Sequence, residues 1–303
     1  MAIHLKHCTI FYRRKNVVYD VIIVGSGPAG ISAGLYTKRA NLETLIISKG
    51  IGTLEKVGNI ENYYGLEKNT NGAKLQQIGE EQAKSLGIEI KKEEVMQIEY
   101  NTNFIVKTLN HTYEAKTIIL ATGSNRKTLN IKGIKEFEGK GISYCATCDA
   151  FFFRNKDVGI LGSKEYALHE AQTLLPIAKS VTMLTNGDEP VEKRLEGLEI
   201  EEKKIREFRG IEKIEEIEFE DDTKKKIDGV FVAIGTASSS DLARKLGVKI
   251  EEKTNNIVVN EKMETNMPGL YACGDCIGGT LQIAKAVYEG MIAGMSVIKY
   301  LKK

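Results

Sequence analysis

The chain has 303 residues and a mass of 33.6 kDa, which is the length of about two domains. Its 43 basic and 41 acidic side chains leave a net charge of +2, which argues against a dedicated nucleic-acid-binding protein. The 42% hydrophobic and 28% charged fractions exclude global disorder, and the apolar runs are too short for membrane helices. Residues 1–18 lack the apolar stretch of a secretory signal, so we expect no membrane association and a cytoplasmic location.

The first predicted element is a buried strand at 19–25, in which the apolar run Val21–Val24 precedes a glycine-rich turn. A helix is predicted at 31–39 and a second buried strand at 44–47. The turn has the spacing Gly-x-Gly-x-x-Gly of a phosphate-binding fingerprint, in which the helix start donates N–H groups to a pyrophosphate. The alternative is a purely structural glycine turn. The acidic residue expected about 20 positions on is missing, because position 48 is Ser48.

Residues 48–75 are rich in Gly and Asn and predict a long functional loop, followed by a helix at 73–86. The stretch 88–122 predicts short strands and ends in an apolar strand at 117–121.

A second unit of the same kind begins about 135 residues after the first. It has a predicted strand at 158–161, a helix at 166–175 and a strand at 181–184. The repeat predicts an α/β protein with two Rossmann-like dinucleotide-binding domains, the second inserted into the first. We expect one domain to span 1–126 and 238–303 and the other to span 127–237. Candidate hinges lie at 124–127 and 235–240, which are rich in Gly, Ser and Thr.

The stretch 188–228 is dominated by Glu and Lys, which favours a solvated surface with a hairpin over a binding patch. A buried strand is predicted at 229–234, another strand at 269–272 and an apolar helix at 281–301.

Four of the five cysteines form two C-x-x-C pairs, and the fifth is Cys8. Cys145 and Cys148 predict a redox-active dithiol at a helix start, where a thiolate is stabilised, and the adjacent Asp149 is a candidate proton donor and acceptor. The second pair is interpreted as small buried residues, with a second redox pair as the minority interpretation. A four-cysteine zinc site remains an alternative, although we expect no metal.

The motifs together resemble the low-molecular-weight thioredoxin reductases, which are two-domain flavoproteins, from about Tyr19 to the C-terminus. The matching segments are Gly25–Gly30, Glu61–Tyr63, Ala121–Gly123, Cys145–Asp149 and Gly274–Asp275. The resemblance implies FAD as cofactor, thioredoxin as substrate and a homodimer. It also implies that Cys148 faces the flavin and that Cys145 attacks the thioredoxin disulfide, with Asp149 as acid–base partner. The FAD-binding residues that it implies are Gly25, Ser26, Gly27, Pro28, Ala29, Gly30, Asn62, Ala121, Thr122, Gly123, Gly274, Asp275, Gln282 and Ile283.

The second unit departs from the family pattern for NADPH at two contacts. Lys164 replaces the central glycine of G-x-G-x-x-A, and Thr185–Asp188 replaces the arginines that clamp the 2′-phosphate. The sequence therefore predicts a degenerate nucleotide site. The chain most resembles the pyridine-nucleotide-independent branch of this family, whose members take electrons from reduced ferredoxin. The alternatives are an NAD(P)H-dependent reductase with an atypical site, a flavin dithiol oxidase and a non-catalytic redox-sensing flavoprotein. Candidate basic spots for an acidic partner are Lys91-Lys92 and Lys203-Lys204.

Overall fold

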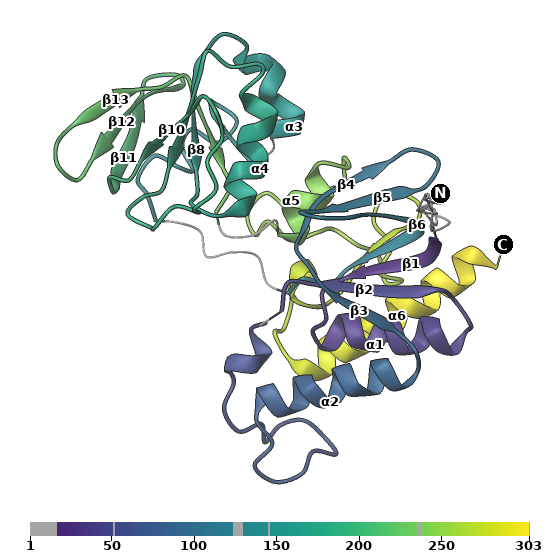
Figure 1. The fold of residues 1–303 in the computed structure, drawn as a ribbon. Helices are drawn as coiled ribbons and strands as arrows, with labels where there is room; N and C mark the ends of the chain where they lie inside the picture. Colours follow the sequence, from purple (N-terminus) through teal and green to yellow (C-terminus); the bar gives the residue numbers. More distant parts are fainter. Residues whose placement is uncertain (1–16, 51, 124–129, 145, 235–237, 303) are drawn as a thin grey trace, which may run out of the picture.

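A computed structural model describes residues 17–50, 52–123, 130–144, 146–234 and 238–302. It contains a mixed sheet and a parallel sheet with helices against them, together with a small antiparallel sheet. Figure 1 shows a larger unit built around the first sheet and a smaller unit built around the second, with helix α5 (Ser239–Arg244) lying between them. The predicted fold class, two nested Rossmann-like domains, is confirmed, whereas the exact boundaries stay a prediction.

The larger unit is a seven-stranded sheet in the order β3-β2-β1-β6-β5-β4, with β15 also paired to β6. Its strands are β1 (Val18–Val24), β2 (Thr44–Ser48), β3 (Glu89–Lys92), β4 (Val95–Tyr100), β5 (Phe104–Thr108), β6 (Thr112–Leu120) and β15 (Leu270–Ala272). The strand β1 lies between β2 and β6 and is parallel to both, so its four apolar residues are almost completely buried. This burial on both faces explains the uninterrupted apolar run.

Three long helices lie together on one face of this sheet (Figure 1). They are α1 (Pro28–Arg39), α2 (Gly72–Ser85) and α6 (Ile283–Leu301). Helices α1 and α6 cross closely at a glycine, because a Cβ at Gly290 would stand 2.1 Å from the carbonyl oxygen of Ala29. The long predicted loop, 48–75, contains the short 3-10 helix η1 (Leu54–Lys56) and overlaps the start of α2 at Gly72, and a second such helix, η3 (Gly274–Ile277), follows β15.

The smaller unit contains a five-stranded sheet in the order β10-β9-β8-β14-β7. Its strands are β7 (Ile142–Ser143), β8 (Asp157–Leu161), β9 (Ser180–Leu184), β10 (Leu198–Glu201) and β14 (Gly229–Val232). Its helices are α3 (Ala146–Asp149), η2 (Ala150–Phe153) and α4 (Glu165–Leu174).

The acidic and basic stretch of the smaller unit folds into more than a solvated hairpin. It supplies β10 to the parallel sheet and forms the antiparallel sheet of β11 (Ile205–Gly210), β12 (Ile214–Phe219) and β13 (Lys224–Lys226). The charged residues cover one face, while Phe208, Ile217 and Phe219 are buried on the other. The strand alternation was therefore hidden by the density of charges in the sequence.

The second half of the predicted hinge at 235–240 is helical in the structure, and its role as a hinge stays a prediction. Ser238 caps α5 through a capping box with Asp241, and Leu242 is completely buried. The residues 235–237 and the other predicted hinge, 124–127, lie outside the described residues. One continuous buried cluster contains residues from both units, among them Ile22, Leu242 and Tyr166, so the two units share a packed junction. No described helix is long and apolar enough to cross a membrane.

Candidate functional site

The first glycine-rich turn joins β1 to α1 at the carboxyl edge of the larger sheet. Gly25 has a φ of +114°, and a Cβ there would lie 2.2 Å from the carbonyl oxygen of Ala121, so only glycine fits. Position 30 also accepts only glycine, because a Cβ at Gly30 would lie 1.9 Å from the carbonyl oxygen of Gly25. Gly27, by contrast, has no heavy atom within 4 Å of its Cβ position. The turn is therefore closed against the protein at Gly25 and Gly30 and open at Gly27.

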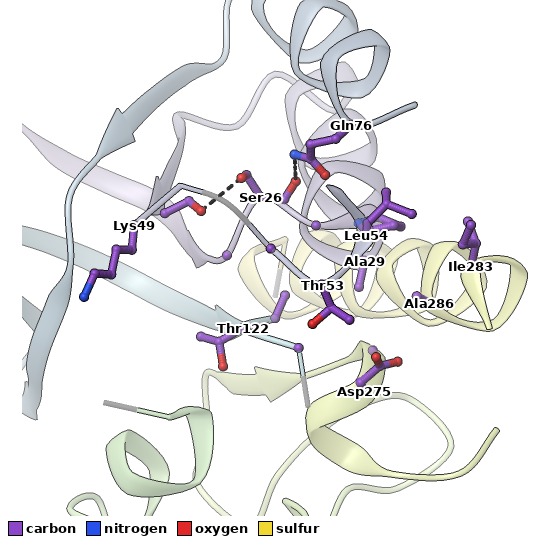
Figure 2. Close-up of a pocket in the computed structure, with 18 of the residues that line it drawn as sticks. Ser26, Ala29, Lys49, Thr53, Leu54, Gln76, Thr122, Asp275, Ile283 and Ala286 are labelled. Atoms are coloured by element: carbon purple, nitrogen blue, oxygen red, sulfur yellow. Dashed lines mark hydrogen bonds between the residues drawn. The ribbon is translucent and has the colours of Figure 1, made fainter. Parts of the chain in front are cut away.

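A cavity of about 590 Å³ lies over this turn. Thirteen of the fourteen predicted FAD-binding residues line it, and Gly30 is the exception because it packs helix against turn. The predicted residues come together from distant segments, since Asn62 Nδ2 donates to Gln282 Oε1 across 3.1 Å. Figure 2 shows Ala29, Thr122, Asp275 and Ile283 around the cavity.

Several cavity residues were missed by the sequence argument. They are Ser48, Lys49, Thr53, Leu54, Gln76, Glu94 and Leu242 among others. Ser26 is tied to two of them, because its hydroxyl donates to Ser48 Oγ at 3.0 Å and its carbonyl accepts from Gln76 Nε2 at 2.7 Å (Figure 2). Ser48 and Lys49 had a usable signal, since Ser48 ends β2 and Lys49 follows it at the sheet edge where ligands bind.

Glu94 and Lys49 form an ion pair at the wall of the cavity, with Nζ and Oε2 2.7 Å apart. The other oxygen of Glu94, Oε1, is buried and has no hydrogen-bond partner within the described protein. A buried carboxylate oxygen without a partner is costly unless a ligand or water supplies a donor. The wall therefore contains an acceptor that is free for the polar part of a ligand.

The turn that carries Asp275 is held by a buried acid of α6. Glu289 Oε2 accepts from the backbone N–H of Gly274 at 2.9 Å and from Lys285 Nζ at 2.9 Å. Gly274 itself has a φ of +80° and would place a Cβ 2.9 Å from the Cβ of Ala29. This arrangement fixes the second predicted cofactor turn directly beside the first.

The predicted dithiol lies in the smaller unit. Cys145 and the side chain of Cys148 lie outside the described part of the chain, so their geometry stays a prediction. The helix α3 begins at Ala146, directly after Cys145, and ends at Asp149. Asp149 Oδ2 accepts from the Ser143 hydroxyl at 2.6 Å, which orients the predicted acid–base carboxyl. The backbone N–H of Ala146 is held by Glu170 at 2.8 Å.

Cys273 and Cys276 are free thiols and are both fully buried. Burial raises the pKa of Cys273 well above its usual value and raises the pKa of Cys276 to about 12. Such thiols stay protonated and unreactive at neutral pH, which favours the packing interpretation of this pair. Among the described residues there is no cluster of three His, Cys, Asp or Glu side chains suited to a metal ion.

The second glycine-rich turn, between β8 and α4, is covered by its own chain. Gly162 repeats the role of Gly25, since its Cβ would lie 2.1 Å from the carbonyl oxygen of Ala233. The segment after β9 lies against the turn, where the N–H of Val191 donates to the carbonyl of Ser163 at 2.8 Å. Lys164 Nζ reaches the carbonyl of Glu189 in the same segment at 3.2 Å.

The fold and the cavity together define a two-domain dinucleotide-binding protein with a cysteine pair in its second domain. The sequence model of the pyridine nucleotide-disulphide oxidoreductases matches residues 19–290. The thioredoxin reductase of Bacillus subtilis (strain 168) is 33% identical over 309 residues, covering 95% of this chain and 96% of that protein.

Two solved structures are also similar. One is the atypical thioredoxin reductase from Desulfovibrio vulgaris Hildenborough, with a TM-score of 0.89, 34% identity and coverage of 94% of this chain and 98% of that one. The other is a ferredoxin–flavin thioredoxin reductase from Clostridium acetobutylicum, with a TM-score of 0.73, 33% identity and the same two coverages, 94% and 98%. The chain belongs to the pyridine nucleotide-disulphide oxidoreductase family and, within it, to the low-molecular-weight thioredoxin reductases. It is therefore a thioredoxin reductase-like flavin disulfide oxidoreductase.

The cavity fits the flavin cofactor that this family implies. The open position at Gly27 leaves room for a pyrophosphate above the start of α1. The unpartnered Oε1 of Glu94 provides an acceptor on the cavity wall. The turn that follows β6 also leaves room for a ligand, because no heavy atom lies within 4 Å of the Cβ position of Gly123.

Proposed function

We propose that this protein reduces the disulfide of thioredoxin with electrons from reduced ferredoxin, through FAD and the Cys145–Cys148 dithiol, without NADPH. The observation that carries the choice of donor is the covered second turn. A pyrophosphate needs the open backbone of the central glycine, and that position holds Lys164, whose side chain is bound to the carbonyl of Glu189. The bond from Val191 to Ser163 keeps a backbone segment over the same turn.

The second NADPH contact is also replaced. After β9 the chain continues through Thr185, Asn186 and Asp188, none of which offers the planar double donor that arginine provides for a 2′-phosphate. Asn186 is instead used by the protein, because its Oδ1 accepts from the N–H of Ile205 at 2.7 Å. This region of the smaller unit thus retains its fold while both contacts for the dinucleotide are occupied or lost.

The dithiol chemistry balances with two electrons and two protons per thioredoxin. The thiolate of Cys145 attacks the thioredoxin disulfide, forms a mixed disulfide and releases one thiol. Cys148 then attacks Cys145, which releases reduced thioredoxin and leaves the Cys145–Cys148 disulfide. Asp149, oriented by the hydroxyl of Ser143, supplies and takes back the protons. Two one-electron ferredoxins restore the dithiol in each cycle.

FAD is the flavin that the cavity residues would hold, and when bound it accepts single electrons and passes on a pair. Gly25, Gly27 and the start of α1 would bind its pyrophosphate, and Asp275 would bind near its ribityl chain. Helix α5 contributes Leu242 to the cavity wall. We also propose that the larger domain spans 1–126 and 238–303.

A ferredoxin–flavin thioredoxin reductase of similar sequence and structure supports the proposed donor. The two basic spots, Lys91-Lys92 and Lys203-Lys204, stay candidates for the docking surface, although Lys91 pairs with Glu89 at 2.5 Å and Lys203 pairs with Asp221 at 2.9 Å. A homodimer is supported by the large side chains that α6 exposes, among them Tyr288 and Met295, which are 57% and 52% exposed.

Anaerobic bleaching of the flavin absorbance tests the donor. The purified protein is mixed with excess NADPH, with NADH and with reduced ferredoxin in separate experiments. We expect rapid bleaching only with ferredoxin, followed by reduction of added thioredoxin. Rapid bleaching by NADPH would contradict the proposal, and bleaching by ferredoxin without thioredoxin reduction would favour a redox sensor.

A Cys145→Ser variant tests the dithiol. We expect it to retain its flavin and its bleaching by ferredoxin but to lose thioredoxin reduction, because the attacking thiol is absent. The matched control is Cys276→Ser, which changes a buried thiol at the other C-x-x-C pair and should remain active. Full activity of Cys145→Ser would transfer the catalytic role to Cys273 and Cys276.

A further inference from the structure

A buried ion pair joins the two units of the molecule. Lys245 follows α5, and its Nζ lies 2.7 Å from Oε1 of Glu170 on α4. Both side chains are almost completely buried, with exposures of 3% and 2%. Helix α5 is attached to the larger unit, because the Ser239 and Thr122 hydroxyls lie 2.7 Å apart. A buried ion pair contributes little net stability compared with apolar packing, so its presence here calls for a specific role.

The second oxygen of Glu170 identifies that role. Oε2 accepts the backbone N–H of Ala146 at 2.8 Å, and Ala146 is the first residue of the helix α3 that contains Cys148. One carboxylate therefore bridges Lys245 and the backbone of the C-x-x-C segment. Each bond involves a charged group in a water-poor setting, where geometry is held tightly.

The same end of α5 reaches both sides of the dithiol segment. The guanidinium of Arg244 lies 5.4 Å from the centre of the Tyr144 ring, and Tyr144 directly precedes Cys145. Two residues earlier in α5, Leu242 lines the large cavity. The end of α5 thus connects the cavity wall to the ring of Tyr144 and, through Lys245 and Glu170, to the backbone of Ala146.

We propose that Glu170 and Lys245 are positioning residues that hold the dithiol segment at a fixed distance and direction from the cofactor cavity. This inference rests on the proposed function, in which the dithiol exchanges electrons with a group bound in that cavity. A transfer of this kind is sensitive to position, and a misplacement of about 1 Å costs roughly 10²-fold in rate. An apolar contact would keep the units together but would not fix the orientation of Ala146.

The test uses three variants of the flavin-loaded protein: Lys245→Met, Glu170→Ala and the double variant Lys245→Met/Glu170→Gln. Reduced methyl viologen serves as the electron source, so that the docking of ferredoxin does not enter. For each single variant we expect kcat for thioredoxin reduction to fall about 10- to 100-fold with little change in KM, because the thioredoxin-binding surface is untouched. The double variant carries no unpaired buried charge and keeps a carbonyl that can accept from Ala146, so kcat should return to within about threefold of the parent.

Hydrogen exchange provides a second readout that does not depend on catalysis. We expect the amides of 146–149 to lose protection in Glu170→Ala and to keep it in the double variant. Lys249→Met, an exposed lysine close by in the sequence, is the control and should change neither readout. The inference is overturned if the double variant is no better than the single ones, or if kcat stays unchanged while only the melting temperature falls. Failure of the proposed function can be told apart from failure of this inference. If only the proposed function is wrong, Cys145→Ser stays active, while the amides of 146–149 still lose protection in Glu170→Ala.

Discussion

The glycine-rich turns after β1 and after β8 are alike at their first residue, Gly25 or Gly162. They differ at their third residue, which is Gly27 in one turn and Lys164 in the other. Gly25 and Gly162 both stand against a carbonyl oxygen of a neighbouring strand end, at 2.2 and 2.1 Å from their Cβ positions. Two residues later, Gly27 faces open cavity space, whereas Lys164 is bound to a segment that covers its turn.

This difference separates what the fold requires from what a ligand requires. The first glycine is required by the close approach of the backbone to an adjacent strand, whatever is bound. The second glycine is required only by a phosphate that must approach the turn. A unit can therefore lose its ligand and keep its fold, as we propose for the smaller unit.

The largest effect is expected when the first turn is given the residue of the second. Gly27→Lys places a side chain where the structure shows open space, so the fold should be unaffected while the pyrophosphate is displaced. We expect flavin affinity to fall roughly 100-fold or more, equivalent to about 2.7 kcal/mol. The ratio of flavin to protein absorbance after purification measures the loss.

Circular dichroism and the melting temperature of the flavin-free protein are the controls for Gly27→Lys. They should match those of the flavin-free parent. Normal flavin content in this variant would show that the open space at Gly27 is not where the phosphates bind.

A smaller loss is expected when the acid that holds the Asp275 turn, Glu289, is changed. Glu289→Gln keeps the shape of the side chain but removes the charge that accepts from Gly274 and Lys285. We expect flavin to bind about tenfold more weakly, because the bonds from Gly274 and Lys285 then lose their charged acceptor. Titration of the flavin-free protein with FAD gives the affinity, and Glu261→Gln, an exposed acid elsewhere, is the control.

The reverse exchange at the second turn should have little effect. Lys164→Gly removes the side chain, but the bond from Val191 to Ser163 remains, and Thr185–Asp188 still stands in place of the arginines that would clamp the 2′-phosphate. We expect the rate of flavin bleaching by NADPH to change less than about threefold, because one restored contact does not rebuild the binding of the whole ligand. A large gain in NADPH-dependent bleaching would show that Lys164 alone excludes the nucleotide.

The sequence was sufficient wherever a signal is local. The run Val21–Val24, the spacing of Gly25, Gly27 and Gly30, and the repeat at 158–184 each indicate a unit whose parts are close in the chain, and the fold class followed from them. The cavity residues carried over from the family resemblance also converge in space, although their binding role stays a prediction.

The sequence was insufficient where tertiary contacts decide. The Gly, Ser and Thr residues of 235–240 give no local sign of a helix, yet Ser238 is the N-cap of α5 through a capping box, and Ser239 and Ser240 are buried in that helix. Gln76 contributes to the site from 50 positions beyond Ser26, and no local pattern marks it. The pair of Glu170 and Lys245 is separated by 75 residues and could not be inferred from spacing.

The smallest expected effect concerns His169 on α4, the helix that follows the covered turn. Burial, together with the positive charges of Lys245 and Lys107, lowers the pKa of this imidazole below 6.5, against the opposing influence of Glu170. The unfolded chain therefore binds a proton that the folded protein does not, in the window just below pH 6.5. The free energy of unfolding should fall as the pH drops through this window, by at most about 1.4 kcal/mol per pH unit for one proton.

Urea denaturation at several pH values tests this. The free energy of unfolding should depend less steeply on pH in both His169→Gln and His169→Leu than in the parent. A dependence as steep in these two variants as in the parent would mean that His169 is already charged in the folded junction, which would place a second cation beside Lys245.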